Sequence, residues 1–286
     1  MTVNVNDSDP ANANVPVNVL RPGEERLMRS VNVFEALAVL ALLAADASAS
    51  ERRFTYTYES TVLAPGEREL EPWTTWRAGR DGYYSAFDER LEFEVGLTER
   101  LQTSLYLNFG AVTAGAARDT STSFEGVSSE WKLKLSDPVA DALGSALYLE
   151  LAAGPSRAAV EAKLILDRRM GGLLVALNLS GERAWDLGVN PTEAETELQV
   201  VGGVSWAVTP ALAVGLEVRE VNELAGSEVE SAVLSGGPAV SWIGPTWWAT
   251  LTVLPQWVAF KGATHGHLDL ADYERAETRL VFGWHL

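Results

Sequence analysis

A regular alternation of apolar and polar residues is the feature that most restricts what this chain can fold into. The stretch GLTERLQTSLYLNFG, residues 96–110, shows the pattern clearly. Leu101, Leu105, Leu107 and Phe109 fall on one side of it, and the residues between them are mostly polar. Because successive side chains of a β-strand point to opposite faces, this period of two predicts a strand with one apolar and one polar face.

About a dozen such runs follow Glu67, separated by polar or turn-forming breaks. The expected strands are 68–78, 87–97, 101–110, 124–135, 145–153, 157–166, 172–182, 193–208, 211–221, 230–242, 246–258 and 272–286. No linker or shift in composition occurs after Ser50. The sequence therefore predicts a single all-β domain of about twelve strands over residues 50–286.

The breaks between the runs alternate in length along the chain. Short breaks contain turn residues, as at 98–100 and 209–210, whereas 111–123, 183–192 and 259–271 are longer or more polar. In an antiparallel up-and-down meander, this alternation places the short turns at one end and the long loops at the other. Transmembrane β-barrels have this arrangement, and we predict a single barrel of that class.

Three observations favour an apolar exterior over a soluble barrel with an apolar interior. A barrel of about twelve strands is too wide for side chains to fill, and a charged lumen can hold water. Tryptophans of the apolar phase lie beside short turns or the chain end, and one lies ten residues further along its strand, which projects to about 25 Å, the height of the lipid-facing band. The expected aromatic belt comprises Trp206, Trp242, Trp247, Trp257 and Trp284. Third, the chain carries an export signal.

This export signal is a predicted secretory signal peptide near the N-terminus. After Arg29, an apolar run extends over about 31–45, and the small residues Ala47 and Ala49 follow at suitable cleavage positions. Glu35 interrupts the apolar run, and a buried helix is the alternative. Residues 1–49 are thus expected to be an N-terminal extension plus signal peptide, with Met28 as an alternative true start.

Composition excludes several classes of function. The formal net charge of -17 argues against a nucleic-acid surface, which needs clustered lysine and arginine. The absence of cysteine excludes disulfide frameworks, thiol catalysis and zinc–thiolate sites. No other window approaches the roughly 20 apolar residues of a membrane-spanning helix.

Three segments carry a resemblance to a known group of proteins. They are FTYTYES (54–60), APGERELEPWTTWRAG (64–79) and FDERLEFEVGLTERLQTSLYLN (87–108). They resemble an uncharacterised porin-like family of Gram-negative outer-membrane β-barrels. The ending TRLVFGWHL is similar to the C-terminal strand signal of such proteins, although it ends in Leu286 where phenylalanine is usual.

The resemblance implies a location and partners, and it implies no reaction. The protein is expected in the cell outer membrane, in contact with membrane lipid and lipopolysaccharide. The C-terminal strand is expected to meet the outer-membrane assembly machinery. No nucleic-acid partner and no cofactor are expected, and the solute is unknown.

Charged residues of the polar phase are the candidate lumen lining. They are Arg90, Glu92, Glu94, Lys132, Lys134, Glu161, Lys163, Glu195, Glu197, Glu217, Arg219 and Arg279. Most occur as same-strand pairs two residues apart, so both members of a pair enter the lumen. Their signs are mixed, and no single-sign ladder is visible in the sequence. Two interpretations stay open: a water-filled pathway that selects a solute, or opposite charges that neutralise one another and plug the barrel.

Motifs for metal binding or catalysis are weak. His265 and His267, with Asp269 and Asp272 nearby, form the only metal-like cluster in the sequence, and a polar loop is the favoured interpretation. No GxSxG motif is present, and His285 is the only other histidine. We therefore expect no metal site, no catalytic residues and no enzymatic activity.

The function predicted from the sequence is a porin-like passive channel for small solutes with a charged lumen. One alternative is a plugged structural barrel without transport. A less favoured alternative is a barrel-embedded hydrolase, which would need a histidine beside a nucleophile. A third is a soluble exported binding barrel.

Overall fold

The computed structural model describes residues 51–188, 193–226 and 228–286. The expected N-terminal extension, the signal peptide and the alternative start at Met28 lie outside the described residues. Within the described ranges, the chain contains no helix with the length and apolar character needed to cross a membrane.

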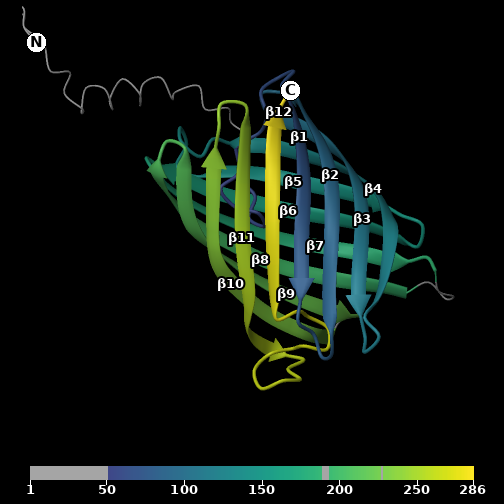
Figure 1. Cartoon of the computed structure of the whole chain (residues 1–286). Helices are drawn as coiled ribbons and strands as arrows, with labels where there is room; N and C mark the ends of the chain where they lie inside the picture. Colours follow the sequence, from purple (N-terminus) through teal and green to yellow (C-terminus); the bar gives the residue numbers. More distant parts are fainter. Residues whose placement is uncertain (1–50, 189–192, 227) are drawn as a thin grey trace, which may run out of the picture. The chain divides into compact units, whose positions relative to one another are not determined.

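The chain forms one closed, antiparallel β-barrel (Figure 1). Its strands are β1 (Arg68–Ala78), β2 (Tyr84–Thr98), β3 (Leu101–Ala114), β4 (Asp119–Ser136), β5 (Gly144–Ala153), β6 (Arg157–Met170), β7 (Leu173–Asp186), β8 (Glu193–Thr209), β9 (Leu212–Ala225), β10 (Glu228–Ile243), β11 (Trp247–Lys261) and β12 (Ala276–His285). Each strand pairs with its neighbour in the sequence, and β12 pairs with β1. The predicted all-β barrel of twelve antiparallel strands is confirmed.

Several strands extend further than alternation alone predicts. The expected loop 111–123 is largely strand, because β3 runs to Ala114 and β4 begins at Asp119. Here the β4 sequence DTSTS, residues 119–123, is polar on both faces, so its hydrophobic period is lost. Backbone pairing continues nonetheless, and the hydroxyls of Thr113 and Thr120 lie 2.9 Å apart across the strands. The alternation of apolar and polar residues therefore stops before the strands themselves end.

The two ends of the barrel differ in their connections. One end carries both edges of the closure, the start of β1 and the end of β12 (Figure 1). Its connections are the short turns 99–100, 171–172, 210–211 and 244–246 and the longer 137–143. We call this the short-turn end. The opposite, long-loop end carries 79–83 and the longest connection, 262–275. In outer-membrane barrels the short turns face the periplasm.

Apolar side chains cover the outside of the barrel wall. In β3, Leu105 is 62% exposed while the adjacent Tyr106 is 1% exposed, and in β5 the pair Leu149 and Tyr148 has values of 40% and 3%. The same contrast recurs in other strands, where exposed leucine, valine and phenylalanine alternate with buried glutamate, serine and threonine. A continuous apolar exterior of this size is compatible with lipid and would be an aggregation hazard in water.

A segment that precedes the first strand lies inside the barrel. We call residues 51–64 the inner segment. Phe54, Tyr56, Tyr58 and Leu63 are all nearly fully buried. Phe54, Tyr56 and Tyr58 each pack on residues of the wall in a separate cluster, of which the largest contains Tyr58, Trp73, Ala146, Tyr148, Ile165, Trp248 and Val281. The expected barrel region 50–286 therefore includes a stretch that fills the lumen and takes no part in the wall.

Because Leu149 in the middle of β5 faces outward, a charged side chain at this position should lower the free energy of unfolding of the barrel. We expect Leu149→Arg to destabilise the folded barrel by about 2–4 kcal/mol, because the guanidinium would face hydrocarbon. Urea unfolding in lipid vesicles measures this difference. The control Leu149→Phe keeps an apolar side chain and should stay near the wild type. Equal stability of all three proteins would contradict the assigned outer face.

Candidate functional site

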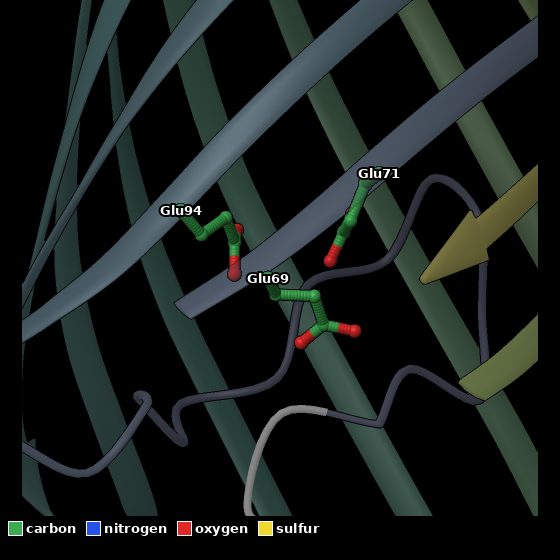
Figure 2. Close-up of side chains that lie close together, drawn as sticks. All are labelled: Glu69, Glu71 and Glu94. Atoms are coloured by element: carbon green, nitrogen blue, oxygen red, sulfur yellow. The ribbon is translucent and has the colours of Figure 1, made fainter. Parts of the chain in front are cut away.

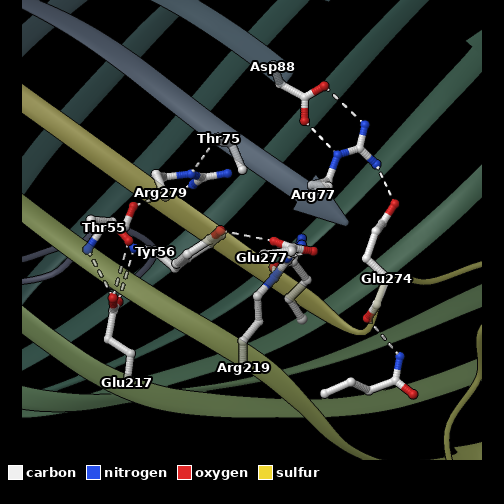
Figure 3. A network of polar contacts seen from close by, with 12 residues as sticks. Thr55, Tyr56, Thr75, Arg77, Asp88, Glu217, Arg219, Glu274, Glu277 and Arg279 are labelled. Carbon is white, nitrogen blue, oxygen red and sulfur yellow. Dashed lines mark hydrogen bonds and ion pairs between the residues drawn. The ribbon is translucent and has the colours of Figure 1, made fainter. Parts of the chain in front are cut away.

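The inner segment is anchored chiefly by the carboxylate of Glu217 in β9. Backbone N–H groups of Thr55, Tyr56 and Thr57 donate to Glu217 oxygens at 3.1, 3.0 and 2.7 Å. Thr252 of β11 donates its hydroxyl to the same carboxylate at 2.5 Å. Figure 3 shows Glu217 aimed at this stretch of chain. One side chain thus satisfies three successive buried amides, which would otherwise carry a large desolvation penalty.

Other wall side chains continue this pattern along the inner segment. Asn178 accepts from the Tyr58 amide at 2.5 Å and donates to the Tyr58 carbonyl at 3.0 Å. Asp167 accepts from the amide and hydroxyl of Ser60, and Gln102 accepts from the amide of Leu63. The wall therefore holds the inner segment through side chains, much as a protein holds a bound peptide, and its own strand ladder stays closed without the segment.

Charged residues at the start of the inner segment add ionic contacts. Arg52 lies 3.6 Å from Glu71, and its guanidinium stacks over the rings of Tyr58 and Trp73 at 4.2 and 4.6 Å. Glu59 pairs with Arg169 near the end of β6. Burial raises the pKa of Glu51, the first described residue, to about 7.

Mixed charges line the lumen beyond the inner segment (Figure 3). Glu277 accepts from the Tyr56 hydroxyl at 2.9 Å and pairs with Arg219 at 3.2 Å. Arg77 of β1 pairs with Asp88 at 2.7 Å and with Glu274 at 3.1 Å. The Arg219–Glu277 and Arg77–Asp88 pairs join different strands, and the Arg77–Glu274 pair joins β1 to the loop before β12. The hydrogen bond to Glu277 ties the Tyr56 ring to the barrel wall.

The residues expected from the sequence to line the lumen occupy different environments. Glu92, Glu94, Lys132 and Glu217 are buried inside the barrel. The half-buried group comprises Arg90, Lys134, Glu161, Lys163, Glu197, Arg219 and Arg279. Glu195 lies at the long-loop end, where its side chain is 80% exposed.

The tryptophans also divide into two groups. The five expected belt residues, Trp206, Trp242, Trp247, Trp257 and Trp284, are between 38% and 55% exposed. Their depth in a membrane stays a prediction. Trp73 and Trp248, in contrast, are buried inside the barrel, where their indole N–H groups donate to Glu71 and Glu69.

Strand register brings glutamates from eight strands into one row. Directly paired positions run Glu69, Glu94, Ser104, Glu130, Glu150, Glu161, Glu182, Glu197 and Glu223, from β1 to β9. Cβ atoms of directly paired residues lie about 4.5–5.5 Å apart. Because the strands are staggered, this glutamate row climbs from the short-turn end at Glu69 to the long-loop end at Glu223. No single-sign ladder is visible along the sequence, because this one runs across the strands and arises from their register.

The part of the glutamate row that contains Glu182, Glu197 and Glu223 lines an acidic cavity at the long-loop end. The cavity has a volume of about 600 Å³. Its charged lining residues are Arg157, Glu182, Glu195, Glu197, Glu223 and Glu230. Arg157 contacts Glu182 at 3.1 Å and Glu195 at 3.8 Å. Carboxylates therefore outnumber cations in this lining, and the cavity attracts positive charge.

Two groups of buried carboxylates lie near the short-turn end. Glu69, Glu71 and Glu94 point toward one another (Figure 2). Glu94 also belongs to a second group, with Glu92 and Glu130. Sequence reasoning missed both groups, since their members come from β1, β2 and β4 and meet only through strand pairing.

The loop cluster that sequence reasoning examined for metal binding is engaged in other contacts. His265 pairs with Asp81 at 2.8 Å. Asp269 accepts from Ser231 at 2.8 Å and from the amides of Ala271 and Asp272. His285 lies 3.7 Å from Glu69. The described ion-pair partners of His265 and His285 are thus carboxylates.

Loss of the Glu217 anchor should loosen the inner segment. The chain has no cysteine, so Thr57→Cys provides a single thiol, at a hydroxyl that has no hydrogen-bond partner among the described residues. We expect Glu217→Ala to raise the maleimide labelling rate of this thiol by about tenfold or more, as a loss of about 1.4 kcal/mol would give.

The matched control for this experiment is Glu220→Ala. Glu220 lies on the opposite, outer phase of the same strand, where it accepts from Asn222. Equal labelling rates for Glu217→Ala and Glu220→Ala would contradict the anchoring role.

Comparisons with known proteins support the architecture. No curated protein matches the sequence. The chain is similar to the crystal structure of the COG4313 outer membrane channel from Pseudomonas putida F1, with a TM-score of 0.61 and 11% identity, covering 82% of this chain and 100% of that chain. The NanC porin matches with a TM-score of 0.51 and 9% identity, covering 76% and 100%. At these identities, the likeness shows the fold.

Location and family follow from these findings. The closed barrel, its apolar exterior and its similarity to outer-membrane channels place the protein in the cell outer membrane, where its outer face contacts lipid. A family model matches residues 46–286, and the chain belongs to that family, described as a family of unknown function (DUF6662).

Proposed function

We propose that the protein is a passive outer-membrane channel for small solutes, closed in the described conformation by its inner segment. The observation that carries this proposal is the way in which the segment is held. Its amides bond to the side chains of Glu217, Asn178, Asp167 and Gln102, so its departure breaks no strand pairing. A gated pathway requires a wall that stays closed and an inner segment that can leave the lumen.

The polar character of the contacts favours gating over permanent closure. Carboxylates and amides that bind a backbone can exchange it for water at modest net cost, so these contacts can break and form again. The inner segment has both kinds of contact: its aromatic residues pack on the wall, and its backbone bonds to polar side chains. The plugged structural barrel without transport is the competing proposal.

The charge of the lumen favours cationic solutes. The glutamate row leads from the acidic cavity at the long-loop end toward the buried carboxylates at the short-turn end. Rings or rows of carboxylates attract cations and repel anions in pores. Arg77, Arg90 and Arg219 are paired with carboxylates and add little free positive charge.

Other expectations belong to the same proposal. We assign the protein no enzymatic activity, since two solved structures that share its fold are named as a channel and a porin. Contacts with lipopolysaccharide would form around the long-loop end. Recognition by the assembly machinery would use β12, which ends at the short-turn end beside β1.

Single-channel recording in planar bilayers tests the gating proposal. Wild-type protein should show rare or brief openings, and Glu217→Ala should raise the open fraction by about tenfold or more, because three buried amides lose their acceptor. Glu220→Ala serves as the matched control and should behave as the wild type. Electrically silent protein in all three cases would favour the plugged barrel.

Ion selectivity tests the charge of the pathway. Under a KCl gradient, openings of the Glu217→Ala protein should give a reversal potential of the sign expected for K⁺ over Cl⁻. Adding Glu182→Gln and Glu197→Gln should move this potential toward zero, since two carboxylates of the entrance cavity are neutralised. Anion preference, or no response to the two substitutions, would contradict the proposal.

A further inference from the structure

The carboxylate group formed by Glu92, Glu94 and Glu130 has the features of a cation site. One oxygen from each residue lies within 4.8 Å of the others. The three residues are 0%, 3% and 1% exposed. They project from β2 and β4 into the interior of the barrel.

Several oxygens of this group receive no N–H or hydroxyl donor from the described part of the chain. Both carboxyl oxygens of Glu92 and one of Glu130 are fully buried in this way, and the interaction available to Glu92 is with the carboxyl group of Glu94, through a shared proton or a bound cation. Tyr106 donates to the other oxygen of Glu130, and Ser104 donates weakly to Glu94 at 3.4 Å. A buried carboxylate without donors carries a large desolvation penalty unless a cation or a proton compensates it.

Nearby cations of the protein do not balance the local charge. Glu69, Glu71, Glu92, Glu94 and Glu130 are all buried here. Arg52 pairs with Glu71 at 3.6 Å, and His285 lies 3.7 Å from Glu69. Lys132 is also close, since it lines a small cavity of about 10 Å³ together with Glu71 and Glu94. If all five carboxyl groups were ionised, these three cations of the described residues would leave an excess of negative charge, which protons or a bound cation must offset.

We propose that Glu92, Glu94 and Glu130 bind one hard divalent cation, with Ca²⁺ as the best match. A donor set made only of carboxylate oxygens selects Ca²⁺ or Mg²⁺ over softer metals, and Ca²⁺ tolerates irregular geometry and bidentate carboxylates. Glu92 can supply two oxygens, because neither is used by a donor of the protein. The ion would link β2 to β4 across β3 at the short-turn end.

Terbium luminescence provides a direct test on the folded, full-length protein. Tb³⁺ replaces Ca²⁺ at oxygen sites, and its emission rises when an excited aromatic ring lies close. Tyr106 donates to Glu130, and the ring centroids of Trp73 and Tyr106 lie 6.3 Å apart, so light absorbed by either ring would excite a bound ion. We expect saturable emission that Ca²⁺ displaces, and about tenfold or greater weakening of binding in Glu92→Gln.

The matched control for this experiment is Glu161→Gln. Glu161 faces the same lumen, but it pairs with Lys163 at 3.3 Å and lies two strands from Glu130. Its substitution should leave the displaceable emission unchanged. Equal loss in both variants would indicate attraction by overall charge and would overturn the site, as would wild-type protein without saturable emission.

Thermal unfolding separates a lost site from a lost fold. Ca²⁺ should raise the unfolding temperature of the wild type and of Glu161→Gln, because a ligand that binds only the folded state stabilises it. Folded Glu92→Gln should show no such rise. A full Ca²⁺ response in Glu92→Gln would overturn the assignment. Neither readout requires conductance, so this inference fails or holds independently of the channel proposal.

Discussion

Closure of the backbone hydrogen-bond ladder between β1 and β12 is the constraint on which the rest of the structure depends. In hydrocarbon, an unpaired amide or carbonyl costs several kcal/mol, so a membrane-spanning sheet must have no free edge. Register from Glu69 opposite His285 to Ala78 opposite Ala276 meets this requirement. Once the wall is closed, one face of every strand must meet lipid and the other must meet the lumen, and alternation in the sequence follows directly.

Closure also creates an interior that the wall alone cannot fill. The inner segment solves this problem with aromatic rings, and the wall adapts to it by presenting acceptors where a peptide backbone needs them. Glu217 is the clearest case, because its carboxylate takes the place of a neighbouring strand for three successive amides. The lumen at the short-turn end therefore binds a peptide that belongs to the same chain, through apolar packing and through polar contacts that water can compete for.

The sequence predicted the strands well and the lumen poorly, for a physical reason. Alternation reports burial against lipid, so β1 and the cores of β2 and β3 were evident, whereas the polar start of β4 was not. The inner segment FTYTYES also alternates, between tyrosine and threonine, yet it pairs with no strand. Only the buried acceptors of the wall distinguish it from a strand, and they come from β3, β6, β7 and β9. The tight connection at 99–100 does place Glu94 opposite Ser104, so hairpin register was the signal that could have shown the glutamate row.

Both interpretations of the lumen charges describe part of this molecule, because they refer to different directions in the wall. Along and between strands in the middle of the barrel, opposite charges meet, as with Arg90 and Glu150 or Arg219 and Glu277. Across the register, carboxylates follow one another from Glu130 to Glu223. Ion pairs cross-link the strands in the middle of the lumen. Carboxylates without a matching number of cations remain at both ends of the glutamate row. A cation entering at the long-loop end would thus be attracted first, and would then meet a barrier formed by paired charges and by the inner segment. In the proposed channel, displacement of that segment, more than the sign of any one residue, would control passage.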